Sequence, residues 1–189
     1  SNIEFAILIH PIELRRKIAT GRMAHLSFKT SPYLSGDDFT EHPRVNALIN
    51  NPEYQCVVLY PGSQAIKIDE PSSLSSEFFD PRKKLLVFVI DGTWNTARTT
   101  MRVSQNLKQL PRICFLPSRP SRFRVRKQPT PECYSTIEAI HRTIELVGPQ
   151  YGFDVSTGDH DQLLRAFDWM VAKQVECGSC RPKLRRVTT

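Results

Sequence analysis

The chain has 189 residues, 40% of them hydrophobic, and a net charge of +7 with a pI near 9.3. A chain of this length can bury a core as one domain, so we expect a single domain over 1–189 in which 160–189 form a terminal helix and a basic tail. No run approaches the ~18 apolar residues of a membrane span, and the N-terminus lacks the pattern of a signal peptide. These absences predict a cytoplasmic protein.

The positive charge favours an anionic partner or substrate. Arginine outnumbers lysine by 17 to 9. The planar guanidinium group binds phosphate and carboxylate through paired hydrogen bonds, whereas an ammonium group offers a point charge. The composition therefore suggests recognition of anions, while it leaves the oligomeric state open.

Short apolar runs rich in branched residues alternate with helical patterns along the chain. The runs at 5–9, 56–60, 85–90 and 113–116 predict buried parallel strands. Helices are predicted at 11–19, 43–50, 95–110, 135–147 and 160–176, the last with an apolar stripe of Leu164, Phe167, Val171 and Val175. Residues 61–84 form one long irregular connection. This alternation predicts an α/β fold with a mainly parallel sheet flanked by helices.

A carboxylate follows one of the predicted core strands. In LLVFVIDGTWN, residues 85–95, the apolar run ends at Asp91 and a helix is expected to begin just after Gly92. Ligands of open parallel sheets bind at the carboxyl ends of strands, where the amides of Gly92, Thr93 and Trp94 would face a carboxylate or phosphate. The alternative is that Asp91 or Thr93 only caps the helix and that Trp94 belongs to its core face.

Several kinds of site are excluded because the chain lacks the motifs that they require. The chain has neither a dinucleotide-binding glycine motif nor a phosphate-binding loop. The IDGT sequence is similar to that of haloacid dehalogenase-type phosphatases, but Val89 stands where their nucleophile would be. Cys177 and Cys180 would supply half of a zinc site, and no second cysteine pair completes it. The five histidines show no pair at the spacing of a metal-binding helix, so we expect no metal.

Two further patterns contain charged residues. Arg122, Arg124 and Arg126 alternate with apolar residues, so an extended chain would place all three on one face. That face would bind phosphates or a carboxylate, or it would be a solvated edge strand. Ser135 and Glu138 have the spacing of a capping box at a helix start, and capping alone could explain Glu138.

The stretch LVFVIDGTWNTAR resembles the D-x-T-W signature of the DTW-domain proteins, which are tRNA-uridine aminocarboxypropyltransferases. The resemblance extends to HPIE and TGRMA (10–13 and 20–24), to VVLYPGSQA (57–65) and to the basic run before STIEA, in the same order. It covers most of residues 5–147. It implies a SPOUT-like α/β fold with a C-terminal trefoil knot that holds S-adenosylmethionine.

The resemblance also implies transfer of the 3-amino-3-carboxypropyl group of S-adenosylmethionine to N3 of a tRNA uridine, which leaves methylthioadenosine. N3 must lose a proton to attack, and Asp91 is the candidate base, with Thr93 and Trp94 beside it in the catalytic motif. The donor site is expected to comprise Tyr60, Pro61, Gly62, Asp91, Gly92, Thr93, Trp94, Ser135, Thr136 and Glu138, with Arg122 or Arg126 binding the donor's carboxylate.

The remaining basic residues predict the tRNA-binding surface. Phosphates would be held by Arg15, Arg16, Lys17, Arg22, Arg98, Arg102 and Arg124. Two other functions stay open: a SPOUT-type RNA methyltransferase, which would use the methyl group of the same donor, and a non-catalytic RNA-binding module. The second would not need Asp91 and Trp94 together.

Overall fold

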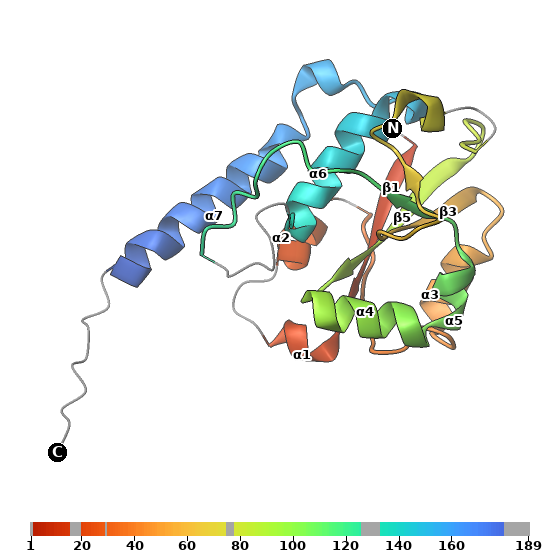
Figure 1. The fold of residues 1–189 in the computed structure, drawn as a ribbon, viewed down its shortest axis with the longest axis horizontal. Helices are drawn as coiled ribbons and strands as arrows, with labels where there is room; N and C mark the ends of the chain where they lie inside the picture. The colour runs from red at the N-terminus through yellow and green to blue at the C-terminus, as the bar shows by residue number, and fades with distance from the viewer. Residues whose placement is uncertain (1, 16–19, 29, 75–77, 126–132, 180–189) are drawn as a thin grey trace.

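A six-stranded parallel sheet forms the centre of the computed structural model, which describes residues 2–15, 20–28, 30–74, 78–125 and 133–179. The strand order is β2-β1-β5-β3-β6-β4, and every neighbouring pair is parallel (Figure 1). The strands are β1 (Ile3–Ile9), β2 (Tyr33–Ser35), β3 (Tyr54–Leu59), β4 (Ile66–Lys67), β5 (Lys84–Asp91) and β6 (Arg112–Cys114). All six therefore end at the same edge of the sheet.

Helices cover both faces of this sheet. The α-helices are α1 (Pro11–Leu14), α2 (Thr20–Ser27), α3 (Pro43–Ile49), α4 (Trp94–Val103), α5 (Gln105–Gln109), α6 (Thr136–Val147) and α7 (Asp161–Ser179). Three short 3-10 helices are η1 (Pro71–Leu74), η2 (Gly148–Tyr151) and η3 (Val155–Thr157). One hydrophobic core joins a sheet face to α2, α6 and α7, which lie together in Figure 1, and the other joins the opposite face to α3, α4 and α5.

The central strands are apolar on both sides because each face is covered. In β1, Phe5 and Ile7 enter the core under α6, while Ala6 and Leu8 enter the core under α4. The strand β5 alternates in the same way. Continuous apolar runs of this kind are typical of buried parallel strands, which confirms the predicted α/β class and mainly parallel sheet.

Several predicted elements differ in the structure. The four predicted strands are present, but β2 and β4 were not predicted, and β4 and η1 lie within the connection predicted to be irregular. The predicted helix 95–110 is interrupted at Ser104, whose buried hydroxyl accepts a hydrogen bond of 3.0 Å from the backbone N–H of Phe39. The predicted helix 11–19 ends at Leu14 in α1, and residues 16–19 lie outside the described part of the chain.

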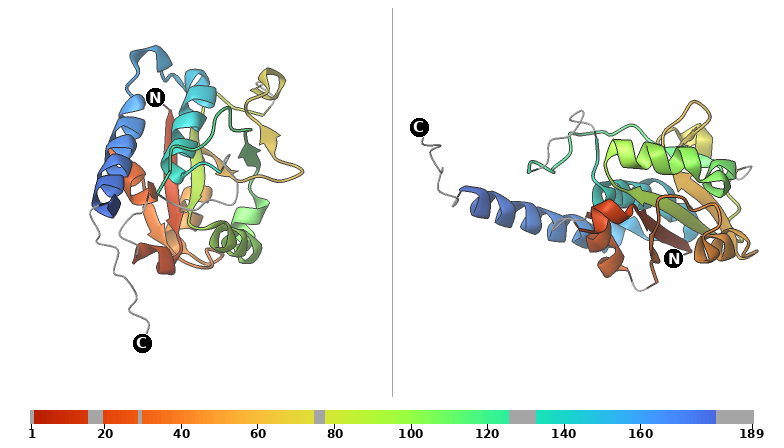
Figure 2. Two further views of the ribbon diagram at one scale, coloured as in Figure 1. Left: turned by 60° about the vertical axis from the view of Figure 1, so that its left-hand side comes forward. Right: turned by 90° about the horizontal axis from the view of Figure 1, so that it is seen from below.

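The helix α7 is longer than the core that it covers. Its first half packs through Leu164, Phe167 and Val171, as predicted from the apolar stripe. Its last turns project beyond the sheet (Figure 1; Figure 2), and Val175 is 51% exposed, so its assignment to the stripe was wrong. Among the described residues, no helix is both long enough and apolar enough to cross a membrane.

Candidate functional site

Asp91 is the last residue of the central strand β5, at the edge where the parallel strands end. It pairs in register with Ile9, the last residue of β1. The side chain is only 6% exposed. Since a carboxylate is costly to bury without partners, the surrounding residues must hold it.

Two segments distant in sequence contact this carboxylate. The Thr136 hydroxyl, in the first turn of α6, donates a hydrogen bond of 2.6 Å to Asp91 Oδ1. On another side, Gly21 of α2 lies so close that a Cβ atom there would be 2.5 Å from Asp91 Oδ2. No other residue type fits at position 21 without displacing the carboxylate. The backbone of α2 and the start of α6 therefore fix Asp91 in place.

Thr93, and not Asp91, caps the helix that follows. Its hydroxyl accepts a hydrogen bond of 3.2 Å from the backbone N–H of Thr96, and its backbone is extended, as expected of an N-cap. Gly92 lies between the two, and a side chain there would collide with the Thr96 hydroxyl and approach Glu13. Of the two residues considered as caps, Thr93 is therefore the N-cap, and the carboxylate of Asp91 is not needed to start α4.

Aromatic side chains lie beside this edge. Trp94 is 40% exposed, so it is not a core residue of α4. Its ring centroid is 6.4 Å from that of Tyr60, which follows β3, and its indole N–H donates to the sulfur of Cys133 at 3.1 Å. The guanidinium of Arg112 lies 5.9 Å from the Tyr60 ring centroid. Together these side chains provide a partly exposed aromatic surface next to Asp91.

Tyr33 of β2 lies near Asp91, and the sequence gave no sign of this proximity. Burial first, and then the negative charge of Asp91, raise the pKa of Tyr33 to about 12, while Arg22 acts in the opposite direction. The phenol is therefore neutral at physiological pH. Its buried hydroxyl has no hydrogen-bond partner among the described residues. Asp91 and the exposed Arg22 of α2 are thus both close enough to Tyr33 to act on it electrostatically.

Glu13 was also missed from the sequence-based site. It is a buried carboxylate in α1, and its Cγ is 3.7 Å from where a Cβ atom of Gly92 would be. The helix α1 begins at Pro11, and His10 caps it by accepting from the backbone N–H of Ile12. The HPIE segment could have indicated this residue, because it places Glu13 in the first turn of the helix that follows β1.

Glu138 organises the turn at the start of α6. Its carboxylate accepts hydrogen bonds of 2.6–2.9 Å from the backbone N–H and hydroxyl of Ser135, the hydroxyl of Ser121 and the backbone N–H of Arg122. The predicted capping box is confirmed, and the acid also anchors the loop that leads to α6. These contacts favour the capping interpretation of Glu138.

The predicted strip of alternating arginines does not form in residues 121–125, which turn instead of extending. Phe123 is buried against Phe167 of α7, at a ring-centroid distance of 5.4 Å, so the chain turns towards the core at this residue. Arg122 forms an ion pair of 2.7 Å with Asp168. Arg124 is exposed, and Arg126 lies outside the described residues. The prediction of one charged face was therefore wrong for the described part of this segment.

The other predicted residues lie where a ligand could reach them. Pro61 and Gly62 are exposed after β3. The described arginines of the predicted tRNA surface are all exposed, namely Arg15, Arg22, Arg98, Arg102 and Arg124, while Arg16 and Lys17 lie outside the described residues. Arg98 and Arg102 share one face of α4, one turn apart.

Known proteins resemble this chain over most of its length. A family model for the DTW domain matches residues 1–175. This chain belongs to the DTW-domain family. The curated protein tRNA-uridine aminocarboxypropyltransferase 2 of Drosophila melanogaster is 26% identical over 149 residues, which cover 76% of this DTW-domain chain and 56% of that relative. The chain thus spans about half the length of the relative, and no solved structure matches it.

Proposed function

We propose that this DTW-domain protein is a cytoplasmic enzyme that transfers the 3-amino-3-carboxypropyl group of S-adenosylmethionine to N3 of a uridine in tRNA. The family assignment and the name of the Drosophila melanogaster relative support a role in tRNA modification. The observation that carries the proposal is the buried carboxylate of Asp91. It is fixed at the end of β5 by Gly21 and Thr136, beside the exposed ring of Trp94.

The residues around Asp91 fit the chemistry of this donor, which combines an adenine ring, a sulfonium cation and an amino-acid arm. The partly exposed ring of Trp94, tilted by 58° from that of Tyr60, offers an aromatic face for the adenine. Gly92 leaves the backbone before α4 free of a side chain, so a ligand can approach it closely. Pro61 and Gly62 after β3, together with Ser135 and Thr136 at the start of α6, would enclose the donor.

When bound, the donor supplies an electrophilic carbon next to its sulfonium. Asp91 would accept the proton from N3 of the uridine, which makes that nitrogen nucleophilic. The hydrogen bond from Thr136 and the contact with Gly21 hold the carboxylate in one orientation, so little reorganisation is needed when the uridine arrives. Thr93 acts on this chemistry indirectly, because its cap starts α4 and thereby positions Trp94.

The donor's amino-acid arm must be held so that the correct carbon faces the nucleophile. The backbone amides at the start of α4 are one group that can bind its carboxylate. Arg122 stays a second prediction for this role, and it would first have to leave its ion pair with Asp168. The trefoil knot also stays a prediction, because residues 126–132 before α6 lie outside the described part of the chain.

The tRNA would bind across exposed arginines on the elements next to Asp91. Arg98 and Arg102 on α4 and Arg22 on α2 come from elements that flank Asp91 in space. Guanidinium groups on such a surface position a nucleic acid through its phosphates without reading its sequence. Arg15 and Arg124 would extend the same surface.

The proposal can be tested by incubating the purified protein with S-adenosylmethionine and unmodified tRNA transcripts. We expect mass spectrometry of the digested RNA to show a uridine carrying one aminocarboxypropyl group, together with an equal amount of methylthioadenosine. A methylated nucleoside with adenosylhomocysteine would instead identify a methyltransferase. Tight tRNA binding without either product would identify an RNA-binding module and overturn the proposal.

A further inference from the structure

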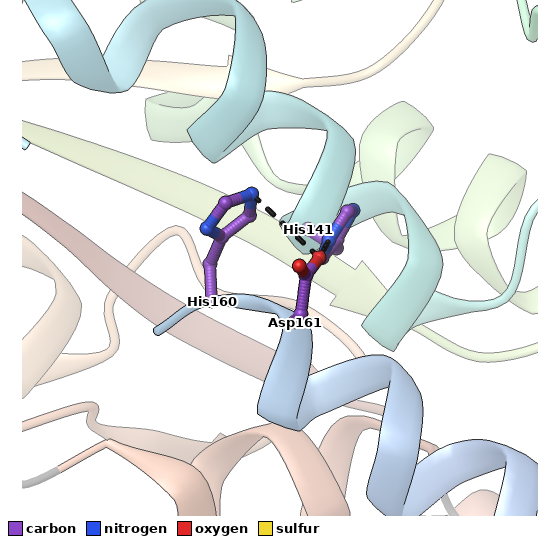
Figure 3. Close-up of side chains that lie close together, drawn as sticks. All are labelled: His141, His160 and Asp161. Atoms are coloured by element: carbon purple, nitrogen blue, oxygen red, sulfur yellow. Dashed lines mark hydrogen bonds and ion pairs between the residues drawn. The ribbon is translucent and has the colours of Figure 1, made fainter. Parts of the chain in front are cut away.

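Two buried histidines and a half-exposed aspartate meet where α6 and α7 come together (Figure 3). His141 lies in the middle of α6, while His160 and Asp161 lie at the start of α7. One ligand atom from each residue lies within 4.8 Å of those of the other two. The spacing of 141 and 160 in sequence gave no sign of this cluster, because two different elements bring the rings together.

We propose that His141, His160 and Asp161 form a binding site for one divalent transition-metal ion, with zinc as the best match. Two imidazole nitrogens and a carboxylate oxygen are ligands that zinc accepts, and the half-exposed Asp161 leaves room for a fourth ligand from solvent. The site would be structural, because it joins α6 to the start of α7.

The present distances are close to those that an ion requires. Asp161 Oδ1 is 2.8 Å from His141 Nε2 and 3.9 Å from His160 Nε2. Tetrahedral zinc with bonds of ~2.0–2.1 Å places its ligand atoms about 3.3 Å apart. The Asp161–His141 distance must therefore lengthen slightly, and the Asp161–His160 distance must shorten slightly.

The charged neighbours of His141 suit a ligand role for this residue. Its Nδ1 lies 3.8 Å from Glu145 Oε2, on the same helix, and the Glu145 carboxylate is itself held by Arg142 at 3.0 Å. A metal-binding histidine usually donates its second ring N–H to a carboxylate, and Glu145 would have to move slightly closer to Nδ1 to accept that hydrogen bond.

His160 has a ring nitrogen that faces the other two residues. Its ring is almost fully buried, and its Nε2 is 3.9 Å from Asp161 Oδ1, which is beyond hydrogen-bond distance. An ion bound by both atoms would bridge that gap.

The ring orientation adds a specific consequence. The two imidazoles are stacked, with centroids 4.7 Å apart and an angle of 26° between their planes. Lone pairs in nearly parallel planes do not meet at one point, so each ring must turn about its Cβ–Cγ bond, a torsion with a broad preference. Binding of the ion should therefore unstack the rings.

The test is a metal titration of chelator-treated protein that carries no affinity tag. The Cys177→Ser and Cys180→Ser substitutions belong in the parent protein, because that cysteine pair could bind zinc by itself. Zinc affinity is measured by competition with a coloured chelator, and cobalt binding is followed by its visible absorption. Neither measurement requires tRNA or S-adenosylmethionine, so the result is independent of the proposed function.

We expect the parent to bind one zinc ion, and His160→Gln and Asp161→Asn each to weaken binding by at least the ~10–100-fold that loss of an outer-shell partner costs. His42→Asn is the matched control, because it removes an imidazole from the N-cap of α3 and replaces it with a good cap. Asp161→Asn is nearly isosteric, so its circular dichroism should match that of the parent. The absence of one-to-one binding in the parent, or equal affinities in all variants, would show a metal-free hydrogen-bonded pair and overturn the proposal.

Discussion

Two buried carboxylates lie near the start of α6, and their surroundings differ. Glu138 is 5% exposed and accepts its hydrogen bonds from Ser121, Arg122 and Ser135, all of which belong to its own turn and the loop before it. Asp91 is 6% exposed but lies at the end of a strand, against a glycine from α2 and a hydroxyl from α6.

This difference separates a structural acid from the acid that we propose as the catalytic base. Glu138 satisfies the donors of a turn, so removing it should loosen the loop. Asp91 is not required to cap α4, because Thr93 does so, yet two segments distant in sequence contact its carboxylate. Burial alone does not distinguish the two acids, whereas the origin of their contacts does.

The largest expected effect comes from Asp91→Asn. Asparagine keeps the size of the side chain and can still accept the hydrogen bond from Thr136, but it cannot take a proton at neutral pH. We expect single-turnover transfer at saturating donor to fall by ~10²–10⁴, the usual contribution of a general base. Donor affinity measured by calorimetry should change much less. Loss of both together would instead assign Asp91 to donor binding, and normal transfer would return it to a structural role.

The opposite pattern is expected for Glu138→Ala. The change leaves the backbone N–H groups of Arg122 and Ser135 without their acceptor, and unsatisfied buried donors cost ~1–3 kcal/mol each. The free energy of unfolding in urea should fall by about 3 kcal/mol. Transfer per folded molecule should stay close to that of the unmodified protein. A large loss of transfer without a loss of stability would mean that Glu138 touches a substrate.

Gly21→Ala tests whether the backbone of α2 positions Asp91. The added methyl group would overlap the Asp91 carboxylate, although alanine itself favours a helix. A small displacement of a reacting group can lower transfer by up to ~10²-fold, and we expect a loss between about tenfold and that value in single-turnover assays. Ser27→Ala, at an exposed position of the same helix, is the control. Equal activity of the two variants would show that Asp91 tolerates displacement.

Removing Arg98 and Arg102 together should weaken tRNA binding without affecting the donor. Both side chains are exposed on α4, so each can hold a phosphate. The slope of the logarithm of tRNA affinity against the logarithm of salt concentration should decrease by about two. Arg82→Ala with Lys83→Ala removes the same charge before β5, at the opposite edge of the sheet. An equal effect in that control would mean that only net charge matters.

The smallest effect is expected from Tyr33→Phe, and it concerns stability at high pH. The pKa of Tyr33 is raised from 10.0 to about 12, so the folded protein holds this proton more tightly than the unfolded chain does. This contribution is fully present below pH 10 and is lost as the pH rises from 10 towards 12. In Tyr33→Phe the free energy of unfolding in urea should therefore decline less steeply over that range, by about one proton. An unchanged slope would contradict the raised pKa.

The sequence predicted the parts of this molecule that depend on local pattern. The apolar run before Asp91 placed the acid at the end of a core strand, and Ser135 and Glu138 showed the capping box. The contacts of Gly21 and Tyr33 with the Asp91 region could not be predicted, because they depend on how distant elements pack. The alternation of arginines with apolar residues around Arg124 gave a wrong prediction for a related reason. It did not reveal that Phe123 turns into the core.

The central claim, that the donor binds beside Asp91, can be tested directly by fluorescence because the chain has two tryptophans. Trp94 adjoins Asp91, whereas Trp169 lies on α7, where it is 67% exposed. In Trp169→Phe the remaining Trp94 should report saturable binding of S-adenosylmethionine. In Trp94→Phe the emission of Trp169 should stay constant, although calorimetry still detects binding. A response from Trp169 with none from Trp94 would place the donor near Arg122 and contradict the account.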